Sequence, residues 1–201
     1  MPSTPSVATR LLKLASKRGV LRTRDVTAAG LPRSYLERLT ARGLLVKTGR
    51  GLYMRADAPV TEFRSLAQVA VKAPGGVICL LSALRFHGLT TQAPFEVWLA
   101  LPPGAWAPAG GGPAVRVVRM GGAALELGVE EHGVDGVTVR VFSSAKTVVD
   151  CFRFRNKVGL DVALEALREF RRERGNLDEV WKLARKLRAA NVMRPYLEAT
   201  S

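Results

Sequence analysis

The chain has 201 residues, of which 47% are hydrophobic and 24% are charged, a composition typical of a folded protein rather than a disordered one. Its formal net charge of +14 at pH 7 indicates a polyanionic partner. The two cysteines, Cys79 and Cys151, lie in apolar runs outside any CxxC motif or Cys/His cluster, which favours buried free thiols and argues against a disulfide or a zinc site.

The positive charge is concentrated towards the two ends of the chain. Residues 1–60 contain 12 Lys and Arg against 3 Asp and Glu, residues 61–141 contain 6 of each, and residues 142–201 contain 13 against 8. We therefore expect basic surfaces on both terminal parts and a neutral middle. The first ten residues lack the apolar core of a signal peptide, and no apolar run is long enough to cross a bilayer. These features predict a cytoplasmic protein without a membrane partner.

Residues 1–57 show the pattern of a helix-turn-helix. Hydrophobic periodicity predicts three helices here, over residues 3–18, 24–29 and 32–42. Thr23 is the candidate N-cap of the second helix, and Gly30 and Gly43 are placed to end the second and third helices. Residues 20–21 predict a short strand between the first two helices.

A basic hairpin follows the third predicted helix. Residues 44–46 and 52–54 predict two strands, and residues 47–51 predict a tight turn that carries the cations Lys47 and Arg50. A helix-turn-helix followed by such a hairpin predicts a winged helix-turn-helix. In that fold a helix enters the major groove of DNA, and the hairpin beside it can reach the backbone or the minor groove.

Eight residues are candidate DNA contacts, because they lie on the outer face of the third helix, in the hairpin, or next to the second helix. They are Arg22, Arg24, Arg33, Ser34, Tyr35, Arg38, Lys47 and Arg50. Arginine and lysine bind phosphates, and arginine also reads guanine in the major groove. The residues alone leave two alternatives open, namely a basic face that is only solvated and a winged helix that binds a protein.

The middle of the chain predicts a small sheet with helices. A helix is expected over residues 62–72, a buried helix or strand-helix unit over 77–87, and strands over 95–101, 115–120 and 137–142. Residues 104–113, rich in Gly, Pro and Ala, predict an exposed loop in which Trp106 is a candidate interface aromatic. Its glycines lack the lysine of a phosphate-binding loop. Residues 130–131 predict a solvated turn.

The last third of the chain predicts helices over residues 144–155, 160–174, 177–190 and 193–199. Asn176 is the candidate N-cap of the third of them. The complete pattern predicts an α+β fold. We expect residues 1–57 to form a winged helix-turn-helix domain and residues 60–201 to form a mixed α/β domain with a small sheet and a helical C-terminus.

Six residues of the second domain are candidates for a basic face or a partner contact: Lys146, Asp150, Arg153, Arg168, Arg171 and Arg172. Lys146 and Asp150 are four residues apart, so an ion pair within one helix explains them, and a contact with DNA or protein is the alternative. The arginines of residues 168–174 alternate with acids, which fits either a solvated face or a nucleic-acid contact. His87 and His132 have no catalytic partner nearby, and no catalytic residue, metal ligand or cofactor site is predicted.

Three short motifs support a family assignment. They are RGLY at residues 50–53, SAL at 82–84 followed by HGL at 87–89, and SAKTVVD at 144–150 followed by Phe152-Arg153. Their combination with an N-terminal winged helix resembles the AbiEi family, the antitoxins of type IV toxin–antitoxin systems. The winged helix alone is shared by many regulators, so the resemblance depends on all three motifs together.

The resemblance implies two activities. The winged helix would bind inverted repeats in the promoter of its own operon and repress it. The C-terminal domain would counteract an AbiEii-like nucleotidyltransferase toxin, with or without a direct complex. We expect a protein without enzymatic activity that is a monomer in solution or a dimer on DNA. A stand-alone winged-helix regulator without a toxin partner is the main alternative, and a nucleic-acid-processing enzyme is a third.

Overall fold

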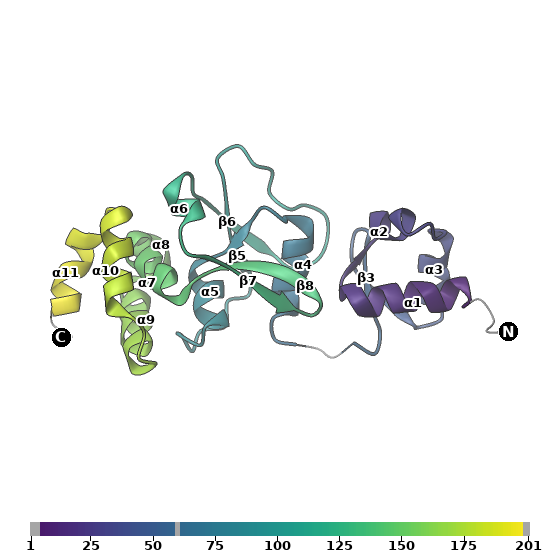
Figure 1. Cartoon of the computed structure of the whole chain (residues 1–201), viewed down its shortest axis with the longest axis horizontal. Helices are drawn as coiled ribbons and strands as arrows, with labels where there is room; N and C mark the ends of the chain where they lie inside the picture. Colours follow the sequence, from purple (N-terminus) through teal and green to yellow (C-terminus); the bar gives the residue numbers. More distant parts are fainter. Residues whose placement is uncertain (1–4, 59–60, 199–201) are drawn as a thin grey trace. The chain divides into compact units, whose positions relative to one another are not determined.

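A computed structural model describes residues 5–58 and 61–198 of the chain (Figure 1). Its contacts divide the chain into two compact units. Unit 1 comprises Met1–Pro74, Pro108–Pro113 and Gly133–Val139, and unit 2 comprises Gly75–Ala107, Ala114–His132 and Arg140–Ser201. The grouping therefore adds a helix and two short segments to the predicted N-terminal domain. Whether residues 1–57 and 60–201 fold as separate domains stays a prediction.

Unit 1 begins with three helices and a three-stranded sheet. The elements are α1 (Val7–Arg18), β1 (Leu21–Arg22), α2 (Thr23–Ala28), α3 (Ser34–Ala41), β2 (Leu45–Gly49) and β3 (Leu52–Arg55) (Figure 1). The antiparallel sheet has the order β1-β3-β2. This is the predicted winged helix-turn-helix. Residues 3–4 of the first predicted helix lie outside the described residues, and α1 begins after Ser6, whose hydroxyl accepts a hydrogen bond from the Thr9 N–H.

The predicted glycine stops are confirmed. Gly30 follows α2 with φ 67°, and Gly43 follows α3 with φ 68°. Only glycine adopts this left-handed conformation without a steric cost, so the chain can turn sharply out of each helix. The Leu31 N–H then bonds back to the Val26 carbonyl at 3.0 Å, which fixes the turn between α2 and α3.

The predicted N-cap of α2 is wrong. Thr23 is the first residue of the helix, and its N–H and hydroxyl both donate to the Gly51 carbonyl in the hairpin. The Asp25 carboxylate instead accepts the N–H of Arg22, the residue before the helix, at 2.9 Å. The start of α2 is therefore tied to the β2–β3 hairpin, which we call the wing.

A small hydrophobic core lies between the three helices and the sheet of unit 1. It contains Leu11, Ala15, Leu21, Val26, Leu31, Leu36, Leu39, Leu45 and Tyr53. Leu36 and Leu39 are the buried residues of α3, as predicted from their spacing. Because the inner face of α3 is anchored in this way, its outer face projects to solvent.

Two further segments belong to unit 1. Helix α4 (Arg64–Lys72) follows the wing, and the tip of the β7–β8 hairpin contributes residues 133–139. Asp135 and Gly136 form the turn of that hairpin with φ values of 49° and 74°, as an Asp-Gly pair favours. The Thr61 hydroxyl donates to the Asp135 carboxylate at 3.0 Å, which joins the hairpin tip to the segment before α4.

A five-stranded mixed sheet has the order β6-β5-β4-β8-β7. Its strands are β4 (Val77–Ile78), β5 (Val97–Leu101), β6 (Val115–Arg119), β7 (Val129–Val134) and β8 (Val137–Phe142), and the short helices α5 (Leu80–Phe86) and α6 (Ala123–Glu126) lie between them. The apolar stretch 77–87 is thus a strand followed by a helix. The solvated turn predicted at residues 130–131 is wrong, because these residues belong to β7, whose place at the edge of the sheet leaves both exposed.

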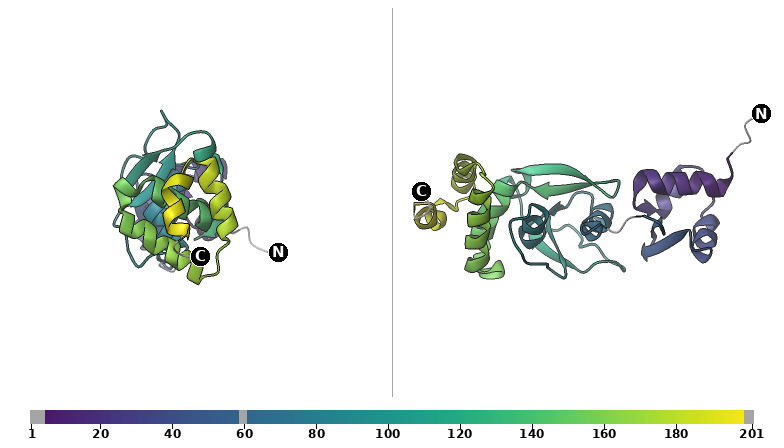
Figure 2. Two further views of the ribbon diagram at one scale, coloured as in Figure 1. Left: turned by 90° about the vertical axis from the view of Figure 1, so that its left-hand side faces the viewer. Right: turned by 90° about the horizontal axis from the view of Figure 1, so that it is seen from below.

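Five helices complete unit 2: α7 (Ser144–Arg153), α8 (Arg155–Val158), α9 (Leu160–Arg172), α10 (Leu177–Lys186) and α11 (Ala190–Glu198). In Figure 2, α10 and α11 lie side by side at the C-terminal end of this unit. The Asn176 side chain accepts the N–H groups of Asp178 and Glu179 and so confirms the predicted N-cap of α10. Residue 199 of the last predicted turn lies outside the described residues.

Candidate nucleic-acid interface

The outer face of α3 carries four of the predicted contacts. Arg33, Ser34 and Arg38 are exposed, and Tyr35 is half-buried. The Arg38 guanidinium lies over the Tyr35 ring, 4.8 Å from its centroid, which limits the freedom of both side chains. The Arg33 Nε donates to the Thr27 hydroxyl at 2.8 Å and thus links the start of α3 to α2. The structure therefore brings these side chains together on one surface, partly ordered before any partner binds.

The wing presents the two cations that its sequence predicts. Lys47 and Arg50 are both exposed. Strand β2 continues to Gly49 with a bulge after Lys47, so the turn itself is shorter than predicted and consists of Arg50 and Gly51. Arg24, on α2, is exposed as well.

In the part of the chain that the structure describes, no carboxylate neutralises the exposed cations of this surface. In residues 5–58 and 61–198, none of the following side chains forms an ion pair with a carboxylate: Arg24, Arg33, Arg38, Lys47 and Arg50. A phosphate can therefore pair with them without breaking an existing ion pair, and its bound counterions are released. Exposed Glu37 on α3 is a carboxylate of the kind that can accept a hydrogen bond from cytosine N4.

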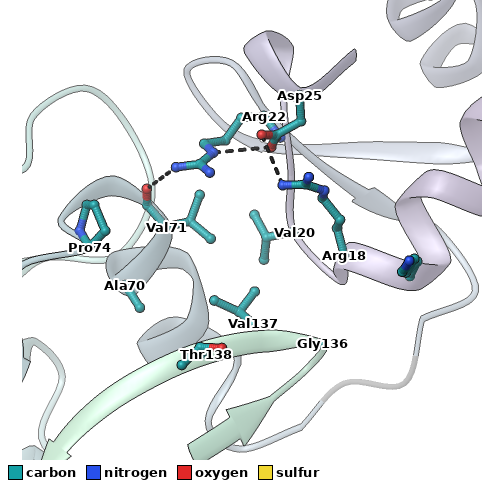
Figure 3. Close-up of a pocket in the computed structure, with 11 residues that line it drawn as sticks. Arg18, Val20, Arg22, Asp25, Ala70, Val71, Pro74, Gly136, Val137 and Thr138 are labelled. Carbon is teal, nitrogen blue, oxygen red and sulfur yellow. Dashed lines mark hydrogen bonds and ion pairs between the residues drawn. The ribbon is translucent and has the colours of Figure 1, made fainter. Parts of the chain in front are cut away.

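Arg22 occupies a different environment from the other candidates. Its Nε bonds to Asp25 at 3.2 Å, and its terminal nitrogen donates to the Val71 carbonyl of α4 at 3.2 Å (Figure 3). Asp25 is buried and also pairs with Arg18 at 3.3 Å. These residues lie on one wall of an open cavity of about 430 Å³ within unit 1. We therefore remove Arg22 from the proposed DNA-facing set, because its donors hold α2 and α4 together.

The ion pairs of Asp25 predict an acid-sensitive contribution to stability. Burial would raise the pKa of Asp25, but hydrogen bonds from the Arg22 backbone and guanidinium and the charge of Arg18 together hold that pKa below its ordinary value. A carboxyl whose pKa is lower in the folded state stabilises the protein above its unfolded-state pKa, and this contribution is lost as the pH falls through the folded-state pKa.

Asp25→Asn is therefore expected to destabilise the protein at pH 7 by about 1–3 kcal/mol, since it removes bonds to a charged group. The difference from wild type should be constant above about pH 5 and shrink below about pH 4. Urea unfolding followed by circular dichroism over this pH range measures it. A difference that persists unchanged at low pH would show that the carboxylate charge is not the cause.

The predicted pair in the second part of the chain is formed, but it is buried. Lys146 and Asp150 are both 0% exposed and make an ion pair on α7, and Arg153 adds a second bond to Asp150 at 2.6 Å. Burial lowers the pKa of Lys146, while the Asp150 carboxylate opposes this effect. Since neither Lys146 nor Asp150 reaches the surface, we assign them to the core of unit 2 and not to a contact with DNA or toxin.

The predicted arginines of α9 are on the surface. Arg168, Arg171 and Arg172 are all exposed, and Arg172 forms ion pairs with Glu169 on the same helix and with Glu173 just after it. Ion pairs between exposed side chains such as these contribute little to stability. Part of the positive charge of these arginines is therefore neutralised by neighbouring carboxylates, and a role of this face in binding stays a prediction.

The remaining polar features of unit 2 hold its own elements together. The His87 Nε2 lies 2.7 Å from the Phe142 carbonyl, so this histidine fastens the end of α5 to the end of β8, and burial lowers its pKa. Cys79 and Cys151 are buried free thiols, as predicted.

Trp106 is 95% exposed. Among the described residues no three His, Cys, Asp or Glu side chains gather where they could hold a metal ion, and no helix is long and apolar enough to span a membrane.

Comparison with protein families assigns part of the chain. Residues 10–56 match the family described as "Transcriptional regulator, AbiEi antitoxin". The resemblance is confirmed for this segment. The AbiEi-like segment runs from within α1 to the end of β3, so it contains both α3 and the wing. The chain is thus similar to DNA-binding regulators in the region where its exposed cations gather.

A solved structure extends the likeness to the rest of the fold. The crystal structure of the RV2827C protein from Mycobacterium tuberculosis superposes with a TM-score of 0.54 and 18% sequence identity, and the match covers 94% of this chain and 77% of that chain. At this identity the likeness concerns the fold alone. No curated protein matches the chain in sequence.

The sequence did not predict the roles of Asp25, inside the AbiEi-like segment, and of Lys72, outside it. Asp25 organises the start of α2, and the spacing Arg22-x-x-Asp25 was the signal that could have found it. Lys72 donates to the carbonyls of Gly110 and Gly111. No local pattern predicts that contact, because its partners are almost forty residues away.

Proposed function

We propose that the chain is a DNA-binding antitoxin of a type IV toxin–antitoxin system, which represses its own operon through the winged helix and counteracts a nucleotidyltransferase toxin through its C-terminal part. One observation carries the DNA-binding half of the proposal: α3 and the wing display exposed cations that have no carboxylate partner among the residues that the structure describes, inside the segment that matches AbiEi regulators. The protein would act in the cytoplasm and needs no cofactor or catalytic residue for this function.

The geometry supports different roles on DNA for α3, the wing and α2. Helix α3 would enter the major groove, with Arg33, Ser34 and Arg38 directed at base edges, because arginine can make two hydrogen bonds to guanine. Lys47 and Arg50 would bind phosphates from the wing, and Arg24 would bind a phosphate from α2. A monomer that dimerises on its operator fits inverted repeats, since each half-site then takes one winged helix.

The antitoxin half of the proposal rests on the resemblance of residues 82–89 and 144–153. In the structure these motifs support the core of unit 2. The Ser82 hydroxyl accepts the Trp98 N–H at 2.9 Å, and Lys146 and Asp150 are buried. The motifs would therefore maintain the fold, and the exposed surface of unit 2 would act against the toxin. Co-expression with the nucleotidyltransferase encoded beside the gene tests this half, since growth should be restored.

A stand-alone winged-helix regulator is the second candidate. One observation favours it: the family match covers residues 10–56 only and so includes no part of unit 2. In that case no neighbouring gene would encode a nucleotidyltransferase, and co-expression with such a toxin would not restore growth. DNA binding would be unchanged, so a DNA-binding assay does not separate the two candidates.

The first test of DNA binding is a gel shift with the DNA upstream of the gene and a scrambled control of equal length. The proposal expects tighter binding to the upstream DNA at a fixed salt concentration, because specific contacts add to the phosphate contacts. Equal affinity for the two DNAs would contradict autoregulation. No binding to either would leave a winged helix that recognises a protein.

The wing cations should contribute to binding through charge alone. Lys47→Ala and Arg50→Ala are each expected to weaken binding to upstream and scrambled DNA by a similar factor, and to reduce the slope of log affinity against log salt by about one unit. A salt titration by fluorescence anisotropy measures both effects. An unchanged slope in both variants would remove the wing from the interface.

A further inference from the structure

The glycine-rich connection between β5 and β6 lies close to the wing. Its residues 108–113 group with unit 1, and three of them lie against the wing. A Cβ atom placed on Gly111 would lie 3.5 Å from the Arg50 backbone nitrogen and 3.6 Å from the Gly49 Cα, and one on Gly110 would lie 3.5 Å from the Arg50 Cδ. A side-chain carbon added at these glycines would therefore touch the turn of the wing, so the loop backbone passes close to that turn.

Lys72 forms hydrogen bonds with the same loop. It is the last residue of α4, and its ammonium group donates to the Gly110 carbonyl at 2.9 Å and to the Gly111 carbonyl. A Cβ on Gly112 would lie 3.2 Å from the Lys72 Nζ and 3.6 Å from the Thr48 carbonyl. The loop is thus bonded to the ammonium group of Lys72 and lies close to the backbone of the wing.

The glycines allow this arrangement because of their backbone conformation. Gly110, Gly111 and Gly112 have φ values of 77°, 62° and 97°, a region that side chains disfavour. The three peptide groups can therefore turn two carbonyls to one ammonium group while the chain stays close to the wing. Lys47 and Arg50 remain exposed, so the loop supports the wing without covering its cations.

We propose that Lys72 and the triglycine segment Gly110–Gly112 are positioning residues for the wing, which hold it in the orientation that presents Lys47 and Arg50 to the DNA backbone. This inference rests on the proposed DNA-binding function. The strands of the wing belong to a three-stranded sheet, but the tip of a hairpin is less constrained than its strands, and ordering it on binding reduces affinity. A wing that is already supported avoids that loss.

Two substitutions test the support and leave the wing cations in place. Lys72→Met keeps the aliphatic chain and removes the ammonium group, and Gly111→Ala makes the left-handed conformation of the loop unfavourable. Each is expected to weaken binding to the upstream DNA by about three- to tenfold at moderate salt, the size of effect that one or two lost phosphate contacts produce.

Two further variants serve as matched controls. Gly104 lies in the same connection with φ 78°, and a Cβ there meets nothing within 4 Å, so Gly104→Ala introduces the same kind of strain away from the wing. Lys182→Met removes one exposed charge from α10. Both are expected to change the affinity by less than about twofold, because neither alters the wing.

A double-mutant cycle distinguishes positioning from a general structural effect. In the background Lys47→Ala/Arg50→Ala, Lys72→Met should no longer weaken DNA binding, because there are no wing cations left to position. A full effect of Lys72→Met in that background, or none in the wild type, would overturn the inference. If wild type binds neither upstream nor scrambled DNA, the DNA-binding function itself fails, and that result is separate from a failure of the cycle.

Discussion

The double variant Arg33→Ala/Arg38→Ala is expected to lose sequence-specific binding to the upstream DNA while it keeps weak binding to scrambled DNA. Both side chains are exposed on one face of α3 and have no carboxylate partner among the described residues. An arginine that makes two hydrogen bonds to guanine contributes about 1–3 kcal/mol of discrimination. Two such contacts correspond to a loss of about 30-fold to 10⁴-fold in specific affinity.

A second double variant controls for the loss of two positive charges. Arg168→Ala/Arg171→Ala removes the same two charges from the exposed face of α9, outside the AbiEi-like segment. If α3 reads bases, the α9 variant should retain the ratio between upstream and scrambled DNA, and the α3 variant should lose it. Equal losses on both DNAs in the α3 variant would show phosphate contacts only, and a larger loss of specificity in the α9 variant would place recognition in unit 2.

The stability of the α3 variant must be unchanged for this interpretation. Substitutions on an exposed face away from caps and buried networks usually alter stability by less than about 0.5 kcal/mol. The bond from Arg33 to Thr27 is the contact most at risk. A single Arg38→Ala variant, which leaves that bond intact, should still lose part of the specificity.

The elements of the winged helix could be predicted because local chemistry determines them. Gly30 and Gly43 end helices in a conformation that favours glycine, and the spacing of Leu36 and Leu39 defines the buried face of α3. The exposure of Arg38 follows directly, because it lies between those leucines in the sequence and must point outwards. The part of the candidate interface that depends on periodicity and turns was therefore visible in the sequence.

The features that could not be predicted depend on contacts between distant residues. Arg22 looks like any other cation near α2, but Val71 and Asp25 take up its donors. The support of the wing joins Lys72 to a loop almost forty residues later. Strand β7 was mistaken for a turn because an edge strand can expose successive glutamates. The helical spacing of Lys146 and Asp150 predicts their ion pair, but burial depends on the elements packed around α7.

Asp150→Ala is expected to cause the largest loss of stability in unit 2. Asp150 and Lys146 are 0% exposed, so the substitution would leave the Lys146 ammonium group in the core with the Phe142 ring 3.9 Å away and no carboxylate. Removing one partner of a buried ion pair typically costs about 3–5 kcal/mol. That loss is a large fraction of the 5–15 kcal/mol that stabilises an ordinary domain.

Tryptophan fluorescence can follow this effect in unit 2 alone. The chain has three tryptophans, Trp98, Trp106 and Trp181, and all of them belong to unit 2. Urea unfolding monitored at these residues should show a much lower midpoint for Asp150→Ala than for wild type. Arg153→Ala should lower the midpoint less, because the Lys146–Asp150 pair remains. A difference between Asp150→Ala and wild type below about 1 kcal/mol would mean that the buried charge finds water or another partner.

The double variant Lys146→Met/Asp150→Leu tests whether the ion pair serves the fold or antitoxin activity. Apolar side chains of similar volume can replace a buried ion pair with little loss, so this variant should recover most of the stability that Asp150→Ala loses. Whether this variant protects cells from the toxin then distinguishes a structural role of the ion pair from a direct contact with the toxin. If the double variant also protects cells from the toxin, the SAKTVVD motif serves the structure of unit 2, and the surface of unit 2 acts against the toxin. If stability returns without protection, Lys146 and Asp150 have a role in antitoxin activity that their buried position does not reveal.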